Sequence, residues 1–586
     1  MSDAGDSGTL LSALERLRDD LAELHMPLDL PDAQRGRHGA AASRDQLDDY
    51  LLPRLRQADA PLLAVVGGST GAGKSTLVNS LLRERVTRAG ALRPTTRAPV
   101  LAHHPDDAAW FTGDRVLPAL ARSTGEEEPV TAASSSSPAA SALRLVASPG
   151  VPAGLALLDA PDVDSVVDAN RALAAQLLGA ADLWIFVTTA SRYADAVPWD
   201  LLAGAARRGA SVAVVLDRVP AGPGDAAVLR EVRADLAGML RDGGLGAAPL
   251  FSVLETTPGD DGLLPGEAVE PLRRWLSGLA GDARQRALVV RRTLTGALDA
   301  LPRELAPVAG AAAGQAAAVA ALRDDVVTSF AQGREELESE LTDGTLLRGE
   351  VLARWQEFVG TGEFFRSFDA AVGRLRDRLG AVVRGRPAPG PEPVGEAVRS
   401  GVAALVRARC AGALDRTRDR WTARPAGAQV VAVAGPVLDL PPDFDERVGR
   451  LVRDWQRGVL DLVRAEGEGR RTRARVLSFG VNALGVALMV VVFASTAFIP
   501  TGAEVGVGVG AAAVGQRVLE AVFGDAAVRA LADRARADLL RRVDELVDAP
   551  RLRLMEVLES TGVDVGAAGR LEQDLAEVAA ARQEAP

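Results

Sequence analysis

The order of hydrophobic and polar residues divides this chain of 586 residues into regions of different character. Between about residues 51 and 280, short continuous runs rich in Val, Leu and Ile alternate with stretches of helical periodicity. Continuous apolar runs are typical of strands covered on both faces, so this region predicts an α/β fold with a mostly parallel sheet and helices on both sides. The predicted strands are 62–66, 143–146, 155–159, 183–188, 212–216 and 250–254.

Helical periodicity dominates on either side of this region. Residues 9–28 place leucines at helical spacing and predict an amphipathic helix, whereas 29–44 are rich in polar residues, Pro, Gly and Arg and predict a linker. From about 281 to 470 the strand signal is absent, and the mixture of Ala, Leu, Val, Arg and acidic residues predicts an extended helical trunk. A similar pattern over 526–558 predicts C-terminal helices that return to this trunk.

A long uncharged apolar run, 476–499, lies between these helical stretches. Its 24 residues would span about 36 Å as a helix, more than the roughly 30 Å hydrocarbon core of a membrane. Pro500 and Gly502 then predict a turn, and the next apolar run, 505–515, is too short at about 16 Å for a second crossing. We therefore expect 471–523 to insert into a membrane, with a hairpin favoured over a single span. A buried helical hairpin in a soluble domain is the alternative.

Charge and the remaining composition narrow the classes of function. Four arginines within 470–475 precede the apolar run and predict that the chain lies on the cytoplasmic side of the cell membrane. The net charge of −11 argues against nucleic acid as a partner. The single cysteine, Cys410, excludes an internal disulfide, and the acidic residues 1–6 predict no signal peptide. His103 and His104 lack further ligands at metal-binding spacing, so we expect them in a loop or at a strand end.

One residue carries much of the chemical information in this sequence. Of 67 basic residues 66 are arginine, and the exception, Lys74, lies in the stretch 68–75, which fits the phosphate-binding pattern Gly-x-x-x-x-Gly-Lys-Ser/Thr. A compact ammonium fits inside such a loop, where a planar guanidinium is too wide. A predicted strand precedes the loop and a helical pattern follows it, so the loop N–H groups and the helix dipole would face bound phosphates. A Gly-rich surface turn is the alternative.

Further motifs follow this loop in a recognisable order. They are Arg93-Pro-Thr-Thr-Arg-Ala-Pro99, then Asp159-Ala-Pro-Asp162 after a predicted strand, and Asp217-Arg218-Val-Pro220 after another. Together with the loop, they resemble the two switches and the base-recognition motif of the dynamin-like and Era-like GTPases over about 55–280. The apolar hairpin within a helical trunk resembles bacterial dynamin-like proteins in its layout. ABC-type ATPases are a poorer match, because the chain lacks their Ser-Gly-Gly signature.

The resemblance implies a GTPase that transfers a phosphoryl group to water with the help of Mg²⁺. Lys74, Thr96 and Asp162 would act on the phosphates in catalysis. The metal would be held by Ser75 and Thr96 directly and by Asp159 through its water shell. In the loop, the nucleotide-binding residues would be Gly68, Ser69, Thr70, Gly71, Ala72, Gly73, Lys74, Ser75 and Thr76, and at the base they would be Asp217 and Arg218.

The motifs also depart from the family in ways that limit the prediction. Asp162 replaces the glycine whose amide meets the γ-phosphate, and Thr70 stands where dynamins carry a glutamine that serves hydrolysis. Thr95 is chemically equivalent to Thr96. Arg218 can stack on a purine, but Pro220 cannot supply the carboxylate that pairs with guanine, so the choice between GTP and ATP stays open.

Three functions fit these patterns. The leading one is a membrane-associated dynamin-like GTPase whose trunk movement remodels lipid, with GTP, membrane lipid and further copies of itself as partners. The alternatives are a slow regulatory GTPase tethered to the inner membrane, and a membrane scaffold that binds nucleotide without hydrolysis. The expected organisation is an N-terminal helix and linker (1–50), a P-loop GTPase domain (51–280), a helical trunk (281–470), a membrane-inserting segment (471–523) and C-terminal helices (524–586).

Overall fold

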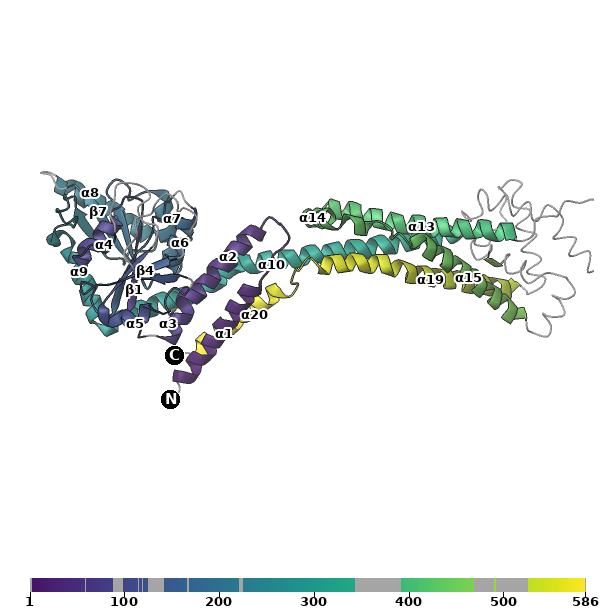
Figure 1. Ribbon diagram of the computed structural model, residues 1–586, viewed down its shortest axis with the longest axis horizontal. Coiled ribbons are helices and arrows are strands. Elements are labelled where there is room, and N and C mark those ends of the chain that lie inside the picture. Colours follow the sequence, from purple (N-terminus) through teal and green to yellow (C-terminus); the bar gives the residue numbers. More distant parts are fainter. Residues whose placement is uncertain are drawn as a thin grey trace, which may run out of the picture. The chain divides into compact units, whose positions relative to one another are not determined.

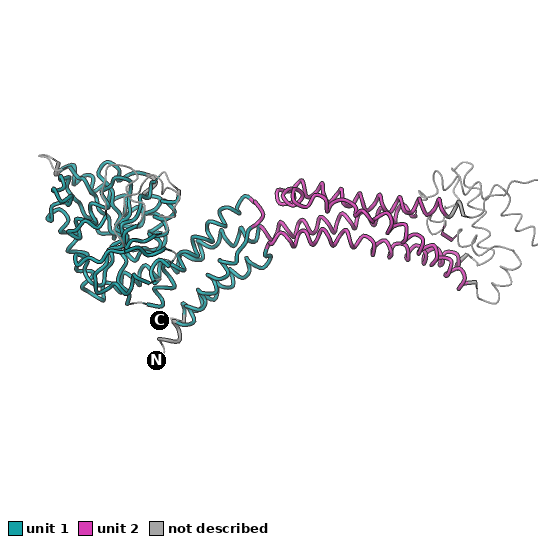
Figure 2. Tube along the Cα trace, in the orientation of Figure 1, with its two compact units in different colours: residues 1–26, 31–314, 564–586 teal, residues 27–30, 315–563 magenta. Residues whose placement is uncertain are grey.

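The computed structural model divides the chain into two compact units (Figure 2). The first unit takes in residues 1–26, 31–314 and 564–586, and the second takes in 27–30 and 315–563. The residues that the structure describes are 3–57, 59–87, 99–113, 115–118, 120–124, 142–165, 168–220, 225–342, 392–467, 490–491 and 525–584.

An eight-stranded sheet forms the centre of the first unit (Figure 1). Its strands run in the order β3-β4-β2-β5-β1-β6-β7-β8, and all neighbouring strands are parallel except β2 and β5. The predicted α/β class and mostly parallel sheet are therefore confirmed, and all six predicted strands form. The bounds are β1 Leu62–Gly68, β2 Val100–His103, β3 Ala121–Ser123, β4 Ala142–Ala147, β5 Leu155–Asp159, β6 Leu183–Thr189, β7 Ser211–Val219 and β8 Leu250–Leu254.

Two strands, β2 and β3, were not predicted. They contain only 4 and 3 residues, too few for an alternating or continuous apolar pattern to stand out. The antiparallel strand β2 also pairs with β5 next to the centre of the sheet, which a purely parallel arrangement does not anticipate.

Helices cover both faces of the sheet, and β1 shows why. Leu63 and Val65 pack into one hydrophobic cluster with residues of α6, α7 and α8, whereas Leu62, Ala64 and Val66 pack into another with residues of α4 and α9. A strand whose successive side chains are all buried must be apolar throughout, which is the pattern that the sequence showed. The bounds are α4 Lys74–Leu82, α5 Ala108–Phe111, α6 Asp168–Gly179, α7 Ala196–Arg207, α8 Asp225–Asp242 and α9 Gly266–Gly281.

The remaining helices of the first unit form a helical extension that joins the two ends of the chain. The apolar face of α1 packs along α20, with Leu14, Leu17 and Leu571 in one cluster. Two ion pairs border this contact. Arg16 of α1 pairs with Glu577 of α20, and an arginine of α20 pairs with an aspartate of α1. The bounds are α1 Asp3–Glu23, α2 Ala33–Gln46, a π-helical turn Leu47–Leu51, α3 Leu52–Arg56, α10 Ala283–Thr342, which continues into the second unit, and α20 Ala567–Glu584.

The prediction of a linker over 29–44 is wrong, because most of it is helix α2. Small residues three or four positions apart make up its buried face, so no stripe of large apolar side chains marks the helix in the sequence. They also let α2 approach its neighbours closely: a side chain at Gly36 would meet Ala311 of α10. The buried residues of α2 are Ala33, Gly36, Ala40 and Ser43.

A buried ion pair joins α3 to the sheet. The Arg54 guanidinium donates to the Asp182 carboxylate at the start of β6 and to the Pro61 carbonyl at 2.8 Å. The same carboxylate accepts from Leu63 N at 2.7 Å, and the Thr293 hydroxyl of α10 donates to the Asp182 carbonyl at 3.0 Å. The start of β1, the start of β6, α3 and α10 therefore meet around one residue, Asp182.

Asp49, in the turn after α2, makes the stability of the first unit depend on pH. Its side chain is 5% exposed, it accepts from Gln176 at 2.7 Å, and Oδ1 has no partner among the described residues. Burial, with the charges of Asp45 and Asp48, raises the pKa of Asp49 to about 6. Because the folded chain holds this proton more tightly than the unfolded chain, the free energy of unfolding falls as pH rises from about 4 to about 6.

Asp49→Asn is therefore expected to flatten this part of the pH profile. At pH 8 the variant should be more stable than the wild type, by up to about 3 kcal/mol. Thermal unfolding followed by circular dichroism between pH 4 and pH 8 measures this, and at pH 4 the two proteins should differ least. An unchanged slope in the variant would assign the pH dependence to other groups.

The second unit is a bundle of long helices around two tryptophans, and the predicted helical trunk is confirmed for the described residues. Trp421 donates through Nε1 to the Leu322 carbonyl at 3.0 Å, and Trp455 donates to the Ala535 carbonyl at 2.8 Å. Both rings are fully buried in one cluster that draws on every helix that the structure describes in this unit. The helices are the second part of α10, α13 Glu392–Thr422, α14 Pro425–Ala434, α15 Phe444–Gly467 and α19 Asp525–Glu559.

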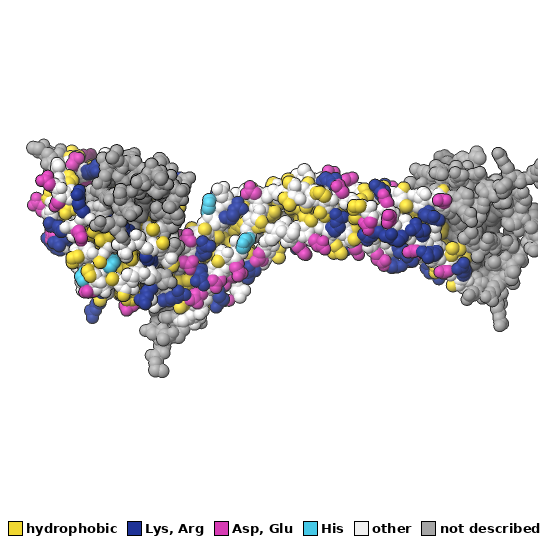
Figure 3. Space-filling model, viewed as in Figure 1, with side chains coloured by type: hydrophobic (Ala, Val, Ile, Leu, Met, Phe, Trp, Pro, Cys, Tyr) yellow, Lys and Arg dark blue, Asp and Glu magenta, His cyan; other side chains and the backbone are white. Residues whose placement is uncertain are grey.

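Arginine and acidic side chains lie interspersed on the face of the second unit seen in Figure 3. Among the ion pairs of the second unit, Arg409 donates to Glu336 at 2.8 Å and to Glu340 at 2.7 Å, and Arg334 pairs with Asp544 at 3.1 Å. The Arg409 pairs are half-buried and the Arg334 pair is exposed, and an exposed pair contributes about 0–1 kcal/mol. The buried apolar cluster therefore supplies most of the stability of the bundle.

Nearly all of the expected membrane segment, 471–523, lies outside the described residues. Val490 and Val491 are the exceptions: both are helical, and both are buried in the cluster of the second unit. Among the described residues, α10 is long and apolar enough to cross a membrane by length and composition. Its Leu305, Val308 and Leu322 are buried in protein clusters, so packing accounts for this apolar composition.

Candidate nucleotide-binding site

The predicted phosphate-binding loop joins β1 to α4 at the centre of the sheet. The loop needs glycine at two points for different reasons. Gly73, at φ +90°, precedes α4, and a side chain there would collide with the Asp217 carboxylate. At Gly68 a side chain would collide with the carbonyl of Val187 on β6. The loop thus lies at the carboxyl end of β1, the edge where open α/β sheets bind their ligands.

Lys74 begins α4 and points back into the loop, where its side chain is 6% exposed. Its ammonium donates to the carbonyls of Gly68 at 2.9 Å and Ser69 at 3.0 Å, and to the Asp162 carboxylate at 2.5 Å. An ammonium has three donors, so all three are used. The structure therefore brings two of the predicted catalytic residues, Lys74 and Asp162, into direct contact.

Ser75 and Asp159, two of the predicted metal ligands, also meet. The Ser75 hydroxyl donates to Asp159 Oδ2 at 2.7 Å, while Asp159 Oδ1 is buried without a partner among the described residues. Burial raises the pKa of the Asp159 carboxyl, opposed by Ser75 and by the charge of Lys74. A buried carboxylate oxygen without a partner, next to a hydroxyl, is the donor set that a hard cation such as Mg²⁺ prefers. The residues present therefore fit the metal.

The third predicted metal ligand, Thr96, lies outside the described residues, as does its alternative Thr95. Thr87 lies beside the described ligands and donates to the Ser75 carbonyl at 3.4 Å. Asn79 of α4 holds it there, accepting from Thr87 N at 2.9 Å and donating to its carbonyl at 2.7 Å. Sequence reasoning missed Thr87, since it belongs to no motif.

A second group that sequence reasoning missed holds Thr70 of the loop. Asp164 Oδ1 accepts from both the backbone N and the hydroxyl of Thr70 at 2.6 Å. Arg192, after β6, donates to the Thr70 carbonyl at 2.8 Å and to Asp164 Oδ2 at 2.8 Å. Burial alone would raise the pKa of Asp164, but the hydrogen bonds from Thr70 and Arg192 outweigh it and lower the pKa. A charged clamp therefore restrains the loop at the position where dynamins carry their glutamine.

The predicted base-recognition motif lies next to the loop. Asp217 and Arg218, at the end of β7, line a cavity of 180 Å³ together with Gly73 and Thr76 of the loop and Glu255 after β8. Burial raises the pKa of Asp217, and Arg218 N donates to its Oδ1 at 2.8 Å. The structure thus places the predicted base contacts beside the predicted phosphate contacts.

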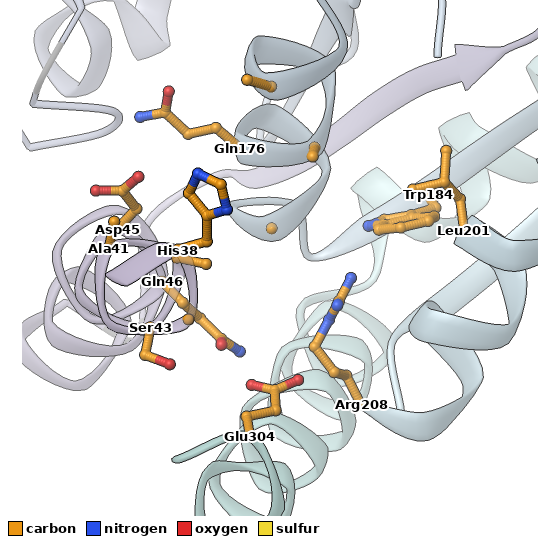
Figure 4. A pocket seen from close by; sticks show the side chains of 15 residues that line it. His38, Ala41, Ser43, Asp45, Gln46, Gln176, Trp184, Leu201, Arg208 and Glu304 are labelled. Carbon is orange, nitrogen blue, oxygen red and sulfur yellow. The ribbon is translucent and has the colours of Figure 1, made fainter. Parts of the chain in front are cut away.

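The other residues singled out in the sequence lie elsewhere. His103 ends β2 and stacks on Phe111 at 5.4 Å between ring centroids, as expected for a strand-end residue. A separate cavity of 540 Å³ lies between α2, α6 and α10, and Figure 4 shows Trp184 and Arg208 on its lining. None of the predicted site residues lines this cavity.

The sheet order and the loop define the class: an α/β P-loop protein with a helical trunk. No family model matches the chain, and no curated protein matches it. A solved structure of an oligomerised bacterial dynamin pair, described as sensing and tethering membranes at long range, is similar over 95% of this chain and 95% of its own, with 10% identity and a TM-score of 0.40. LeoA, a bacterial dynamin GTPase from ETEC, is similar over 100% and 99%, with 12% identity and a TM-score of 0.25.

Shorter structures match a part of the chain. Toc33 from Arabidopsis thaliana, in complex with Mg²⁺ and GMPPNP, covers 42% of this chain and 94% of its own, with 17% identity and a TM-score of 0.24. Bacterial dynamins, the family that the motifs resemble, are thus among the structures similar over most of this chain.

Proposed function

We propose that this chain is a dynamin-like GTPase that binds and hydrolyses GTP with Mg²⁺ and couples hydrolysis to movement of its trunk at a membrane. The pairing of Ser75 with Asp159 at the head of α4 carries the proposal, because it leaves a buried carboxylate oxygen free for a cation beside the phosphate loop. A purely structural turn has no need of a desolvated, partly unpaired carboxylate.

Each residue of the loop has a role in this proposal. Lys74 and the loop N–H groups bind the β- and γ-phosphates and offset the charge that develops on them. Ser75 ligates the cation and Asp159 fixes its water shell. When bound, Mg²⁺ neutralises phosphate charge and aligns the phosphates for attack by water. Thr96 as a further ligand stays a prediction from the sequence.

The contact between Lys74 and Asp162 favours slow turnover. A γ-phosphate that reaches the ammonium must first replace the Asp162 carboxylate there, at 2.5 Å. Thr70 is likewise engaged by Asp164. Both contacts favour the regulatory alternative, in which hydrolysis is slow until the loop is released. Whether Asp162 also acts in catalysis stays a prediction.

Asp162→Asn tests this restraint with little change in shape. Loss of the charge should tighten binding of the triphosphate by about 10-fold, because one charge-assisted hydrogen bond no longer competes for Lys74. Titration of a fluorescent GTP analogue measures the Kd, and phosphate release measures kcat. Unchanged Kd with a large fall in kcat would contradict a restraint and support a catalytic role.

The membrane part of the proposal depends on the apolar segment 476–515 and the arginines within 470–475. It places the protein on the cytoplasmic face of the cell membrane, with lipid and further copies of the chain as partners. Nucleotide titration with Mg²⁺ in the presence and absence of liposomes tests both parts together. Liposomes should bind the protein and raise phosphate release from GTP. Absence of lipid binding would overturn the membrane part, and absence of nucleotide binding would overturn the whole proposal.

A further inference from the structure

The cavity beside the phosphate loop has two carboxylates on its lining, although the usual base-pairing carboxylate is missing from the sequence. The sequence has Pro220 at that position, and this residue does not line the cavity. Asp217 and Glu255 do line it, together with Gly73, Thr76 and Arg218. If the phosphates bind at the loop, as the proposed function requires, the base of the same nucleotide reaches this cavity.

The two carboxylates differ in their burial and in the hydrogen bonds that they already make. Asp217 is 6% exposed, its Oδ1 accepts from Arg218 N, and its Oδ2 lies against Gly73. Glu255 is exposed, and its side chain has no hydrogen bond or ion pair among the described residues. Its backbone N donates to the Val219 carbonyl at 2.7 Å, which fixes Glu255 where β8 ends beside β7. Glu255 therefore combines a fixed position with a free carboxylate.

The end of β7 is irregular where it lines the cavity. The pairing of β7 with β8 shifts register between Leu216 and Val219, and Arg218 adopts φ +52°, a left-handed conformation that is rare outside glycine. Bulges and strained residues of this kind concentrate at binding sites, where they redirect a side chain. Here the irregularity falls on Arg218, whose planar guanidinium can stack on a purine.

We propose that Glu255 selects guanine by accepting hydrogen bonds from N1–H and the 2-amino group. These two donors lie side by side on guanine and match the two oxygens of one carboxylate. Adenine offers a lone pair at N1, which a carboxylate repels, and has no 2-amino group. Glu255, from another strand, thus supplies the function that Pro220 cannot. The inference rests on the proposed function and adds the residue that chooses the base.

The test compares triphosphates in displacement of a fluorescent GTP analogue, with Mg²⁺ present. The wild type should bind GTP at least about 100-fold more tightly than ATP, since a site built for two donors rejects a base that lacks them. Glu255→Gln should lose at least about 10-fold in GTP affinity and gain in affinity for xanthosine triphosphate. Glutamine keeps an acceptor for N1–H and adds a donor for the oxygen at C2 of xanthine.

Two variants serve as controls. Glu267→Gln makes the same change at an exposed residue outside the cavity and should leave all affinities unchanged. Asp217→Asn asks whether the buried carboxylate selects the base instead. Thermal unfolding by circular dichroism confirms that each variant is folded.

The outcomes separate the inference from the proposed function. Transfer of preference from GTP to xanthosine triphosphate in Glu255→Gln supports both. A GTP preference that survives in Glu255→Gln but disappears in Asp217→Asn overturns the role of Glu255 and leaves the GTPase proposal standing. Equal binding of ATP and GTP by the wild type also overturns the inference alone. Binding of no triphosphate overturns both.

Discussion

A Lys74→Ala protein is expected to lose affinity for triphosphates by about 100-fold or more while it keeps its fold. The ammonium is the one charged group on the described part of the loop, and a charge-assisted hydrogen bond contributes about 1.5–3 kcal/mol. Two such bonds to phosphate oxygens give the expected loss, because each 1.4 kcal/mol is tenfold in affinity. Titration of a fluorescent GTP analogue measures it.

Lys74→Arg makes this prediction sharper. Arginine supplies the other 66 basic residues of the chain. If any basic side chain could serve at position 74, we would therefore expect arginine there as well. The two carbonyls that hold the ammonium, at 2.9 and 3.0 Å, leave room for one nitrogen but not for a planar guanidinium. Lys74→Arg should therefore fail to restore binding. Arg230→Ala, an exposed change on α8, is the control, and wild-type affinity in Lys74→Ala would refute the loop as the phosphate site.

The largest effect on stability is expected from Arg54→Met. The change leaves the Asp182 carboxylate buried without its cation, and a broken buried pair of this kind costs about 3–5 kcal/mol. Burial already raises the pKa of Asp182, opposed by the charge of Arg54. Without Arg54 the carboxyl should take up a proton more readily, so the variant should lose less stability at pH 5 than at pH 8.

Urea unfolding followed by circular dichroism at these two pH values measures this loss. The double variant Arg54→Met with Asp182→Asn removes both charges and is the matched control. It should recover much of the stability, because no charge is left buried. A loss below about 1 kcal/mol in the single variant would show that water reaches Asp182, against its full burial in the structure.

Secondary structure was easiest to predict from the sequence where every position of an element must be apolar. The strands at the centre of the sheet are apolar at every position since both faces are covered, and this shows without a structure. Helix α2 was not predicted because its buried face consists of small residues such as Gly36 and Ala40, which pack closely against neighbouring helices. In a sequence, such small residues look like a flexible linker. Small-residue packing becomes visible only when the partner helix is known.

Some residues of the candidate site could likewise be predicted from the sequence, and others could not. Gly68 to Ser75 could be found because the predicted phosphate-binding pattern lies within eight consecutive residues. The clamp on Thr70 could not, since Asp164 and Arg192 lie 94 and 122 residues away along the chain. The position of Glu255 beside Asp217 depends on the pairing of β7 with β8, which joins segments that are distant along the chain. Contacts between distant segments depend on topology, which local patterns do not encode.

The pairing of α1 with α20 has a consequence for synthesis of the chain. Leu14 and Leu17 of α1 are made more than 500 residues before Leu571 and Val578, which share their hydrophobic cluster. For most of translation a stripe of leucines therefore has no partner from α20, while the sheet can already form from residues 62–254. A nascent chain that lacks α20 would thus expose an apolar helix face, accessible to chaperones and proteases, until α20 packs against it.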